Sequence, residues 1–325
     1  SKPPVYDRSA LALSDLERET LSADRAGHWR FMLDRSRTEW TDGILGSLSI
    51  DAASVSDPVL IRGDGQVLYT LASICDDIDM GVTHVVRGSD HVTNTATQIQ
   101  MIRAIGGSVP YFSHHSLLTG PKGEGLSKRL GSLALRDMRD AGIQPMALLS
   151  HLARLGSSDP VELRGSMEEI VAGFDLNQFG SAPTKFDVAD LISITAKYLQ
   201  GLDYADVAQD VAAIGVPEAI AEDFWNVTRT NISTLKDLKN WWKLIQNGAT
   251  PEIDIEDKEF IALAISMLPE GPFDVATWGT WTAAVKQATG RKGKGLFMPL
   301  RRALTGMSHG PDMGALLPLL QNIQR

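Results

Sequence analysis

The stretch from His84 to Ala104 constrains the fold of this chain more than any other. His84–Arg87 is a short β-branched run of the kind found in buried strands. Gly88 and Ser89 interrupt it before an amphipathic segment at 90–104. Strand, turn and helix in this order are typical of half of a nucleotide-binding α/β sheet.

A glycine-rich loop at 120–125 follows this unit and leads into Ser127, Lys128 and Arg129, just before another predicted helix. Glycines on both sides of Lys122 give the loop the freedom to move. A mobile cation beside a strand end indicates phosphate chemistry.

Several short motifs share one order and spacing along the chain. They are Asp64-Gly65, Tyr69-Thr70-Leu71-Ala72, Asp76-Asp77, the segment MGVTHVVRG at 80–88, Asp90-His91 and Leu126-Ser127-Lys128-Arg129. Each alone is common, but together they resemble the second half of the catalytic domain in bacterial class I glutamyl-tRNA synthetases. The resemblance implies a partial Rossmann-type α/β catalytic domain followed by all-α stem-contact and anticodon-binding domains.

The resemblance also implies roles for individual residues. Arg87 would bind the glutamate substrate, because a guanidinium at the carboxyl end of a parallel strand lies where α/β sheets bind ligands and can pair with a carboxylate bidentately. Tyr69, Ser73 and His91 match positions that line the glutamate and adenylate pocket. For His91, a place at a helix start is the alternative interpretation.

The loop Leu126-Ser127-Lys128-Arg129 resembles the signature loop that holds ATP in class I synthetases. Lys128 would be the catalytic cation that reaches the ATP phosphates. The first lysine of the family signature is absent, since Gly125 stands there and Lys122 is the nearest upstream cation. The implied substrates are glutamate, ATP with Mg²⁺, and tRNA(Glu), with tRNA(Gln) as a second candidate.

Other titratable residues are interpreted as structural. Asp76 and Asp77 are expected beyond a helix at 71–74, where they cap a turn. The adjacent His114 and His115 should point to opposite faces of an extended segment, with His115 near the nucleotide pocket or in the core. Neither histidine has the spacing of a zinc site, so no zinc and no protein metal site are expected.

Composition and charge bound the class of protein. A length of 325 residues implies two or three domains, and a single cysteine suits a reducing compartment. No apolar run approaches the roughly 20 residues needed to span a bilayer, so we expect a cytoplasmic protein with no membrane contact. A monomer is expected as its oligomeric state. The net charge of −9 argues weakly against a nucleic-acid partner. However, the segment 286–302 contains six lysines and arginines and no acid.

Four domains are expected from these patterns. They are the end of a connective, acceptor-binding insertion at 1–57, the second half of the nucleotide-binding domain at 58–131, a helical stem-contact domain at 132–203 and a helical anticodon-binding domain at 204–325. Within the first, a helix at 14–23 and strands at 29–33 and 39–41 are predicted. From 58 to 70, two apolar runs form a hairpin, or the second leads directly into a helix.

The C-terminal half has a helical pattern. Met146, Leu149 and Leu152 are predicted to form the apolar face of a helix that opens at Pro145, and Asp187 is predicted to cap another. The tryptophans from 225 onward are interpreted as core residues rather than base-stacking ones. By resemblance to the family's anticodon-binding segment, the expected tRNA contacts are Arg291, Lys292, Lys294 and Arg301.

Three interpretations of function follow. The family's first ATP motif, of the His-Ile-Gly-His type, has no counterpart in these 325 residues. We therefore expect a fragment of a glutamate–tRNA ligase whose activity alone is in doubt. The alternatives are a truncated tRNA-binding or regulatory module without aminoacylation activity, and an unrelated helical scaffold with an α/β cap.

Overall fold

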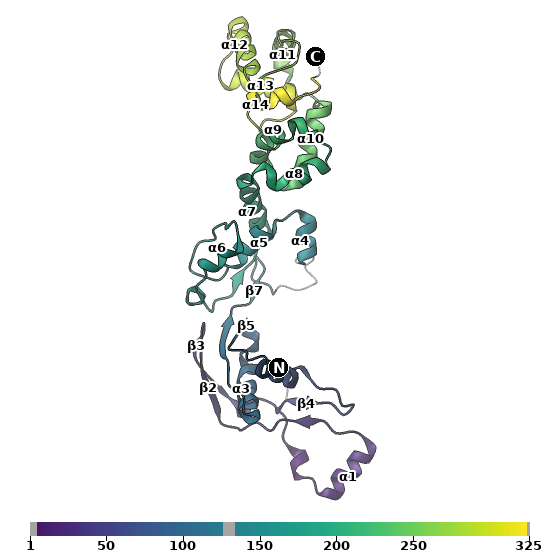
Figure 1. The fold of residues 1–325 in the computed structure, drawn as a ribbon, viewed down its shortest axis with the longest axis vertical. Coiled ribbons are helices and arrows are strands. Elements are labelled where there is room, and N and C mark those ends of the chain that lie inside the picture. The colour runs from purple at the N-terminus through teal and green to yellow at the C-terminus, as the bar shows by residue number, and fades with distance from the viewer. Residues whose placement is uncertain (1–4, 126–133, 324–325) are drawn as a thin grey trace. The chain divides into compact units, whose positions relative to one another are not determined.

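The computed structural model describes residues 5–125 and 134–323, which form two compact units (Figure 1). The first unit contains Ser1–Ser127, Ala153–Val161 and Val171–Phe186. The second contains Lys128–Leu152, Glu162–Ile170 and Asp187–Arg325. The predicted loop Leu126–Arg129 lies outside the described residues.

The first unit begins with a helix and two antiparallel strand pairs. Helix α1 (Asp15–Asp24) starts at Ser14, which forms a capping box with Glu17. The pairs are β1 (Trp29–Arg30) with β4 (Val59–Ile61), and β2 (Arg37–Asp42) with β3 (Gly46–Asp51). The predicted strand at 29–33 is thus shorter, the one at 39–41 is longer, and β3 was not predicted.

The predicted strand–turn–helix unit is confirmed in the same part of the chain. Strand β5 (His84–Gly88) leads through a 3₁₀ turn, η3 (Ser89–His91), into α3 (Val92–Ile105). Strand β6 (Tyr111–His115) pairs with β5 in parallel, so that Arg87 lies opposite His114. Helix α3 lies against β2 (Figure 1), and β2 contacts β6.

Helix α2 (Tyr69–Asp79) packs against α3. Its buried Ile74 meets Met101 and Ile102 of α3 in a small apolar core. The second apolar run leads into a helix, and the two runs also form a short hairpin. In this hairpin Ile61 bridges Val67, and the backbone N–H groups of Leu68 and Arg62 donate to the carbonyls of Leu60 and Gln66. The expected position of Asp76 and Asp77 beyond this helix is wrong, because the helix continues past them to Asp79.

The first unit closes with short parallel strands, β7 (Leu118–Thr119) and β8 (Thr184–Lys185). The second unit is helical. Its first helices are α4 (Leu135–Ala141), α5 (Pro145–Leu152) and α7 (Val188–Gly201), and α6 (Met167–Ala172) spans the boundary between the units. The later ones are α8 (Tyr204–Ala213), α9 (Glu218–Thr228), α10 (Leu238–Asn247), α11 (Lys258–Ser266), α12 (Thr277–Thr289), α13 (Lys294–Thr305) and α14 (Met313–Leu316). The predicted order of an α/β region followed by helices is confirmed.

Two helical predictions have different outcomes. The Asp187 carboxylate accepts a hydrogen bond from the backbone N–H of Ala189, which confirms the cap of α7. The predicted apolar face of α5 is wrong, since Leu149 and Leu152 are exposed while Ser150 and His151 are buried. Ser150 compensates for its burial by hydrogen bonding to the backbone of Arg164.

The tryptophans of the second unit lie in or against its core, as predicted. Trp225, Trp241, Trp242 and Trp281 are buried, and Trp278 packs against them half-buried. Their apolar surface is therefore not free to stack on bases. Within 5–125 and 134–323, no helix has the length and apolar character needed to span a membrane.

Candidate active site and RNA-binding segment

Arg87 lies near the carboxyl end of β5, where its side chain is half-buried and hydrogen-bonded to α3. Its Nη2 donates to Thr95 Oγ1 at 2.7 Å and to Gln98 Oε1 at 2.6 Å. The guanidinium also lies 5.3 Å from the ring centroid of Phe112. Burial lowers the pKa of Arg87 against the opposing effect of Tyr69, Asp77 and Asp90, and arginine stays charged at neutral pH. No carboxylate within 5–125 or 134–323 pairs directly with this half-buried cation, and such a cation is suited to bind an anion.

His114 and Asp42 form a buried pair beside Arg87. Both side chains are fully buried, and His114 Nδ1 lies 2.5 Å from Asp42 Oδ2. On the other edge of the ring, His114 Nε2 lies 2.8 Å from Thr95 Oγ1 and 3.4 Å from Arg87 Nε. The sequence did not predict this pair, because 72 positions separate the two residues.

The two adjacent histidines do point to opposite faces. His114 is buried, whereas His115 is exposed and bonds through Nδ1 to the carbonyl of Ser116. The alternative that placed His115 in the core is wrong. The alternating faces of β6 were the one signal that could have identified His114.

The other predicted pocket residues lie on α2 and in η3. Ser73 Oγ accepts from Gln98 Nε2 at 3.4 Å, so Gln98 connects Ser73 to Arg87. Tyr69 begins α2 and is 67% exposed. His91 directly precedes α3 without capping it through its side chain, and its Nδ1 lies 3.2 Å from Asn94 Nδ2. The structure therefore joins Ser73 to Arg87 by hydrogen bonds through Gln98, while Tyr69 remains open to solvent.

Only the approach to the predicted ATP loop is described. The backbone N–H of Gly120 donates to the carbonyl of Glu124, and Gly123 donates back to Gly120, so residues 120–124 form a tight turn. The Glu124 carboxylate accepts from the backbone N–H of Lys122. The predicted residues Leu126, Ser127, Lys128 and Arg129 follow this turn, outside the described part.

The basic segment 286–302 is less open than its sequence indicates. Arg291 pairs with Asp257 and stacks on Phe260 with 4.0 Å between the guanidinium carbon and the ring centroid. Arg302 pairs with Asp254 at 2.6 Å and with Glu252 at 3.2 Å. The segment contains no acid, but acids from the preceding residues neutralise two of its cations.

The remaining cations of this segment differ in exposure. Lys292 and Lys294 are exposed at the start of α13. Arg301 is half-buried and donates through Nη2 to the carbonyl of Pro311 at 2.9 Å. Its Nη1 is buried without a hydrogen-bond partner among residues 5–125 and 134–323. Burial lowers the pKa of Arg301, and Asp312 opposes this effect.

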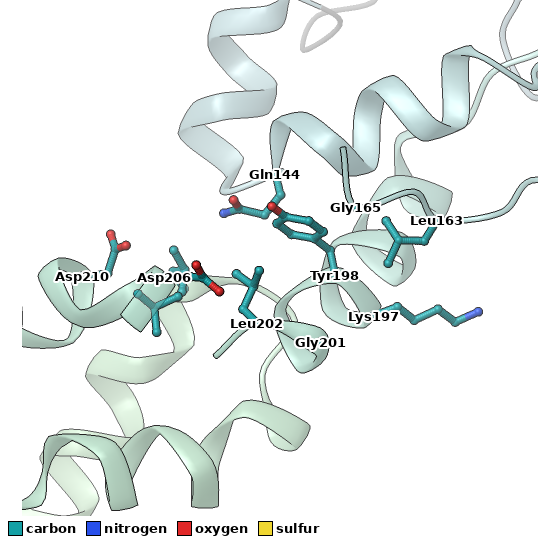
Figure 2. Close-up of a pocket in the computed structure, with 11 residues that line it drawn as sticks. Gln144, Leu163, Gly165, Lys197, Tyr198, Gly201, Leu202, Asp206 and Asp210 are labelled. Carbon is teal, nitrogen blue, oxygen red and sulfur yellow. The ribbon is translucent and has the colours of Figure 1, made fainter. Parts of the chain in front are cut away.

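A cavity of about 610 Å³ opens in the second unit around the junction of α7 and α8 (Figure 2). Its lining residues are Gln144, Leu163, Gly165, Lys197, Tyr198, Gly201, Leu202, Asp206, Val207, Asp210 and Leu235. The Lys197 side chain points away from the carboxylates of Asp206 and Asp210 in Figure 2. None of the predicted site residues that the structure describes lines this cavity. Across the described ranges, no three histidine, cysteine or acidic residues cluster as metal ligands.

Comparison with known proteins identifies the family. Residues 1–192 match the catalytic domain of class I tRNA synthetases (E and Q). The chain is 68% identical over 324 residues to glutamate–tRNA ligase 1 of Roseobacter denitrificans and 69% identical over 324 residues to glutamate–tRNA ligase 2 of a Ruegeria species. Each comparison covers 99% of this chain and 74% of the relative. The chain belongs to the class I glutamate–tRNA ligases.

Solved structures agree with this membership at the level of the fold. A glutamate–tRNA synthetase from Elizabethkingia anophelis matches with a TM-score of 0.79, and a glutamate tRNA ligase from Elizabethkingia meningosepticum matches with 0.80. Both are 24% identical and cover 96% of this chain and 69% of the other. The predicted class I glutamyl-tRNA synthetase family, fold class and enzyme class are therefore confirmed.

The catalytic-domain match divides the predicted residues into two groups. It includes β5, β6 and α3, and with them the hydrogen-bonded group around Arg87. The basic segment 286–302 lies outside it. In this glutamate–tRNA ligase, the hydrogen-bonded group of Arg87, His114 and Asp42 thus belongs to the catalytic domain. The exposed Lys292 and Lys294 belong to the helical region that follows it.

Proposed function

We propose that this chain performs glutamate–tRNA ligation as part of a class I synthetase. Glutamate and ATP form glutamyl-adenylate and pyrophosphate. The terminal ribose hydroxyl of tRNA(Glu) then attacks the carbonyl of the adenylate, forms the glutamyl ester and releases AMP. The observation that carries this proposal is the 68% identity to a curated glutamate–tRNA ligase over 99% of the chain. We also propose that the four predicted domains, 1–57, 58–131, 132–203 and 204–325, divide the work between substrate chemistry and RNA binding.

Arg87 is the proposed glutamate-binding cation, with Tyr69, Ser73 and His91 around the glutamate and adenylate. Support comes from the half-buried guanidinium near the end of β5, where the ligands of parallel α/β sheets bind. Gln98 holds Arg87 and Ser73 in one hydrogen-bonded group. A fixed cation lowers the entropy cost of orienting the substrate.

Lys128 is the proposed catalytic residue, on the loop Leu126-Ser127-Lys128-Arg129. Its ammonium would stabilise the negative charge that develops on the α-phosphate as the glutamate carboxylate attacks it. Mg²⁺ accompanies ATP in this proposal and is bound mainly through phosphate oxygens, as is usual for this ion. Zinc has no part in the proposal.

The proposed tRNA contacts are Arg291, Lys292, Lys294 and Arg301. The exposed Lys292 and Lys294 are free to meet phosphates, since no ion pair engages them among the described residues. Arg291 is partly neutralised by Asp257 and stacks on Phe260. A monomer is the proposed state, with tRNA(Gln) as a second substrate to be tested.

Aminoacylation by the full-length protein tests the proposal. Purified tRNA(Glu) and tRNA(Gln) are incubated separately with ATP and labelled glutamate, and aspartate and glutamine serve as competitors. The expected result is that tRNA(Glu) is charged, and that glutamate is the only amino acid attached to it. If neither tRNA receives glutamate, the proposed function is overturned. If both tRNAs receive glutamate, the function extends to tRNA(Gln).

A further inference from the structure

A continuous path of hydrogen bonds leads from the end of β2 to the guanidinium of Arg87. It runs from Asp42 through His114 and Thr95. We propose that Asp42 and His114 are positioning residues of the glutamate site, which fix the orientation of Arg87 through Thr95. This inference rests on the proposed function, because it assumes that Arg87 binds glutamate.

Asp42 determines which atom donates in each hydrogen bond of this path. Its carboxylate accepts three backbone N–H bonds, from His114 at 3.0 Å, Leu45 at 3.0 Å and Ile44 at 3.1 Å. Burial raises the pKa of Asp42, but the bonds from His114, Leu45 and Ile44 outweigh it, and the net shift is downward. The carboxylate is therefore ionised and can only accept, so the proton between it and His114 belongs to Nδ1.

This tautomer leaves the lone pair of His114 Nε2 facing Thr95. The single hydroxyl hydrogen of Thr95 has two acceptors within reach, His114 Nε2 at 2.8 Å and the carbonyl of His91 at 3.2 Å. The shorter contact favours donation to His114. Thr95 Oγ1 then keeps its lone pairs for the N–H of Arg87 Nη2.

The consequence is a defined set of free donors on Arg87. Of its five N–H groups, the two on Nη2 are engaged by Thr95 and Gln98, and Nε points toward His114. For Nη1, the described part of the chain offers no hydrogen bond. The opposite tautomer would place an N–H of His114 against the Nε–H of Arg87 and rotate the cation away from this arrangement.

The path also depends on a close approach of two strands. The N–H of Gly43 donates to the carbonyl of Phe112 at 2.9 Å, which joins the end of β2 to β6. A Cβ at Gly43 would collide with the Oγ of Ser113. Asp42 therefore reaches His114 because glycine follows it.

Two matched substitutions of His114 in the full-length protein test this inference. In His114→Asn the amide overlaps the Nδ1 position and keeps the bond to Asp42, but nothing remains to accept from Thr95. In His114→Gln the amide overlaps the Nε2 position and keeps an acceptor for Thr95. The measurement is glutamate-dependent ATP–pyrophosphate exchange in the presence of tRNA(Glu), with unfolding temperature as the control for stability.

For His114→Asn, we expect the KM for glutamate to rise about tenfold or more, as for loss of a hydrogen bond to a charged group. The KM for ATP should change by less than about twofold, since Arg87 is the proposed substrate-binding residue whose side chain this path hydrogen-bonds. Compared with His114→Asn, His114→Gln should lower the unfolding temperature more and should lower the affinity for glutamate less. Unchanged KM for glutamate in His114→Asn, or equal rises for glutamate and ATP, would overturn the inference.

Thr95→Val removes the same path at its other end with little change in volume. It should raise the KM for glutamate in the same way, and a normal value in this variant would contradict the proposal even if both His114 variants fail to fold.

When Arg87 is already alanine, adding His114→Asn should cause no further change, whereas additive effects would show that His114 acts elsewhere. Wild-type protein without glutamate-dependent exchange would overturn the proposed function as well, whereas active wild type with unaffected variants would overturn the positioning role alone.

Discussion

Arg87 combines a permanent charge with burial, and this combination makes its surroundings matter. A guanidinium removed from water loses hydration that only hydrogen bonds or an anion replace. Thr95 and Gln98 provide neutral oxygen acceptors rather than a carboxylate. Most of the positive electrostatic potential of Arg87 is therefore not neutralised by these two residues. It would stabilise a bound glutamate carboxylate.

Substitution of Arg87 is the most direct test at the scale of single residues. Arg87→Ala in the full-length protein should reduce kcat/KM for glutamate by about tenfold to a hundredfold, which corresponds to roughly 1.5–3 kcal/mol for a hydrogen bond to a charged group. Arg87→Lys keeps the charge but not the planar fork, so it should recover only part of the loss. Normal kcat/KM in a folded Arg87→Ala variant would remove Arg87 from the glutamate site.

An ion pair between half-buried Arg8 and buried Asp57 predicts how stability depends on pH. The side chain of Arg8, bonded at 2.7 Å, lowers the pKa of Asp57, which is 5% exposed. Between this lowered pKa and the ordinary pKa of about 3.9, the folded state therefore binds fewer protons than the unfolded state. Stability from this pair is complete above that pH and is lost as pH falls through the lower folded value.

Urea unfolding between pH 7 and pH 3 checks this sign. Asp57→Asn should lower the free energy of unfolding at pH 7 and flatten its fall below about pH 4. Glu19→Gln, on the exposed face of α1, is the matched control and should leave the profile unchanged. If the slopes of Asp57→Asn and wild type coincide in acid, Asp57 does not contribute to acid unfolding.

Residue roles could be predicted from the sequence only where local order encodes them. The place of Arg87 near a strand end was predictable because the strand and the following helix are contiguous, and its role in glutamate binding stays a prediction. The pairing of Asp42 with His114 was not, since it depends on β2 lying beside β6 across 72 positions. The contacts of Gln98 with Arg87 and Ser73 likewise depend on how α3 packs on two other elements.

At the scale of elements, helix and strand types were predictable but buried faces were less so. The apolar stripe of α5 predicted burial of Leu149 and Leu152, yet the structure buries Ser150 and His151. Periodicity identifies a helix but does not identify the element that packs against it. Ser150 is buried because the backbone of Arg164 satisfies its hydroxyl group.

The exposed lysines of the basic segment 286–302, which lie at the start of α13, give a prediction at the scale of elements. The double variant Lys292→Ala/Lys294→Ala should flatten the dependence of tRNA affinity on salt by about one unit of log K per log salt for each lost phosphate contact. Arg302→Ala should change the slope little, because Glu252 and Asp254 already neutralise this arginine. Equal effects of the two variants would show that exposure does not decide which cations meet RNA.

At the scale of the whole molecule, the hydrogen-bonded group around Arg87 and the largest helical core belong to different compact units. Arg87 and its partners lie in the first unit, and the basic segment lies in the second. Motif order predicted this arrangement of an α/β region before helices. The four finer domains remain a prediction, since short helices and soft composition changes do not mark their borders.

The last prediction concerns the 325 residues as an isolated polypeptide. Class I activation needs donors on both sides of the reacting phosphate. Arg87 and Lys128 are present in this sequence, but a His-Ile-Gly-His-type motif is not. The isolated chain should therefore bind tRNA(Glu) at low salt and show no glutamate- and tRNA-dependent ATP–pyrophosphate exchange. Adding the first half of the catalytic domain from a curated relative, covalently or in trans, should restore exchange.

Lys128→Ala in the restored enzyme should then lower exchange by about a hundredfold or more, as for loss of other donors to a transition state. Lys122→Ala, on the turn before the loop, is the control and should have a smaller effect if Lys128 is the cation that reaches the phosphates. Robust exchange by the isolated chain would show that other residues hold ATP. Failure of that chain to bind tRNA would instead place the RNA contacts outside these 325 residues.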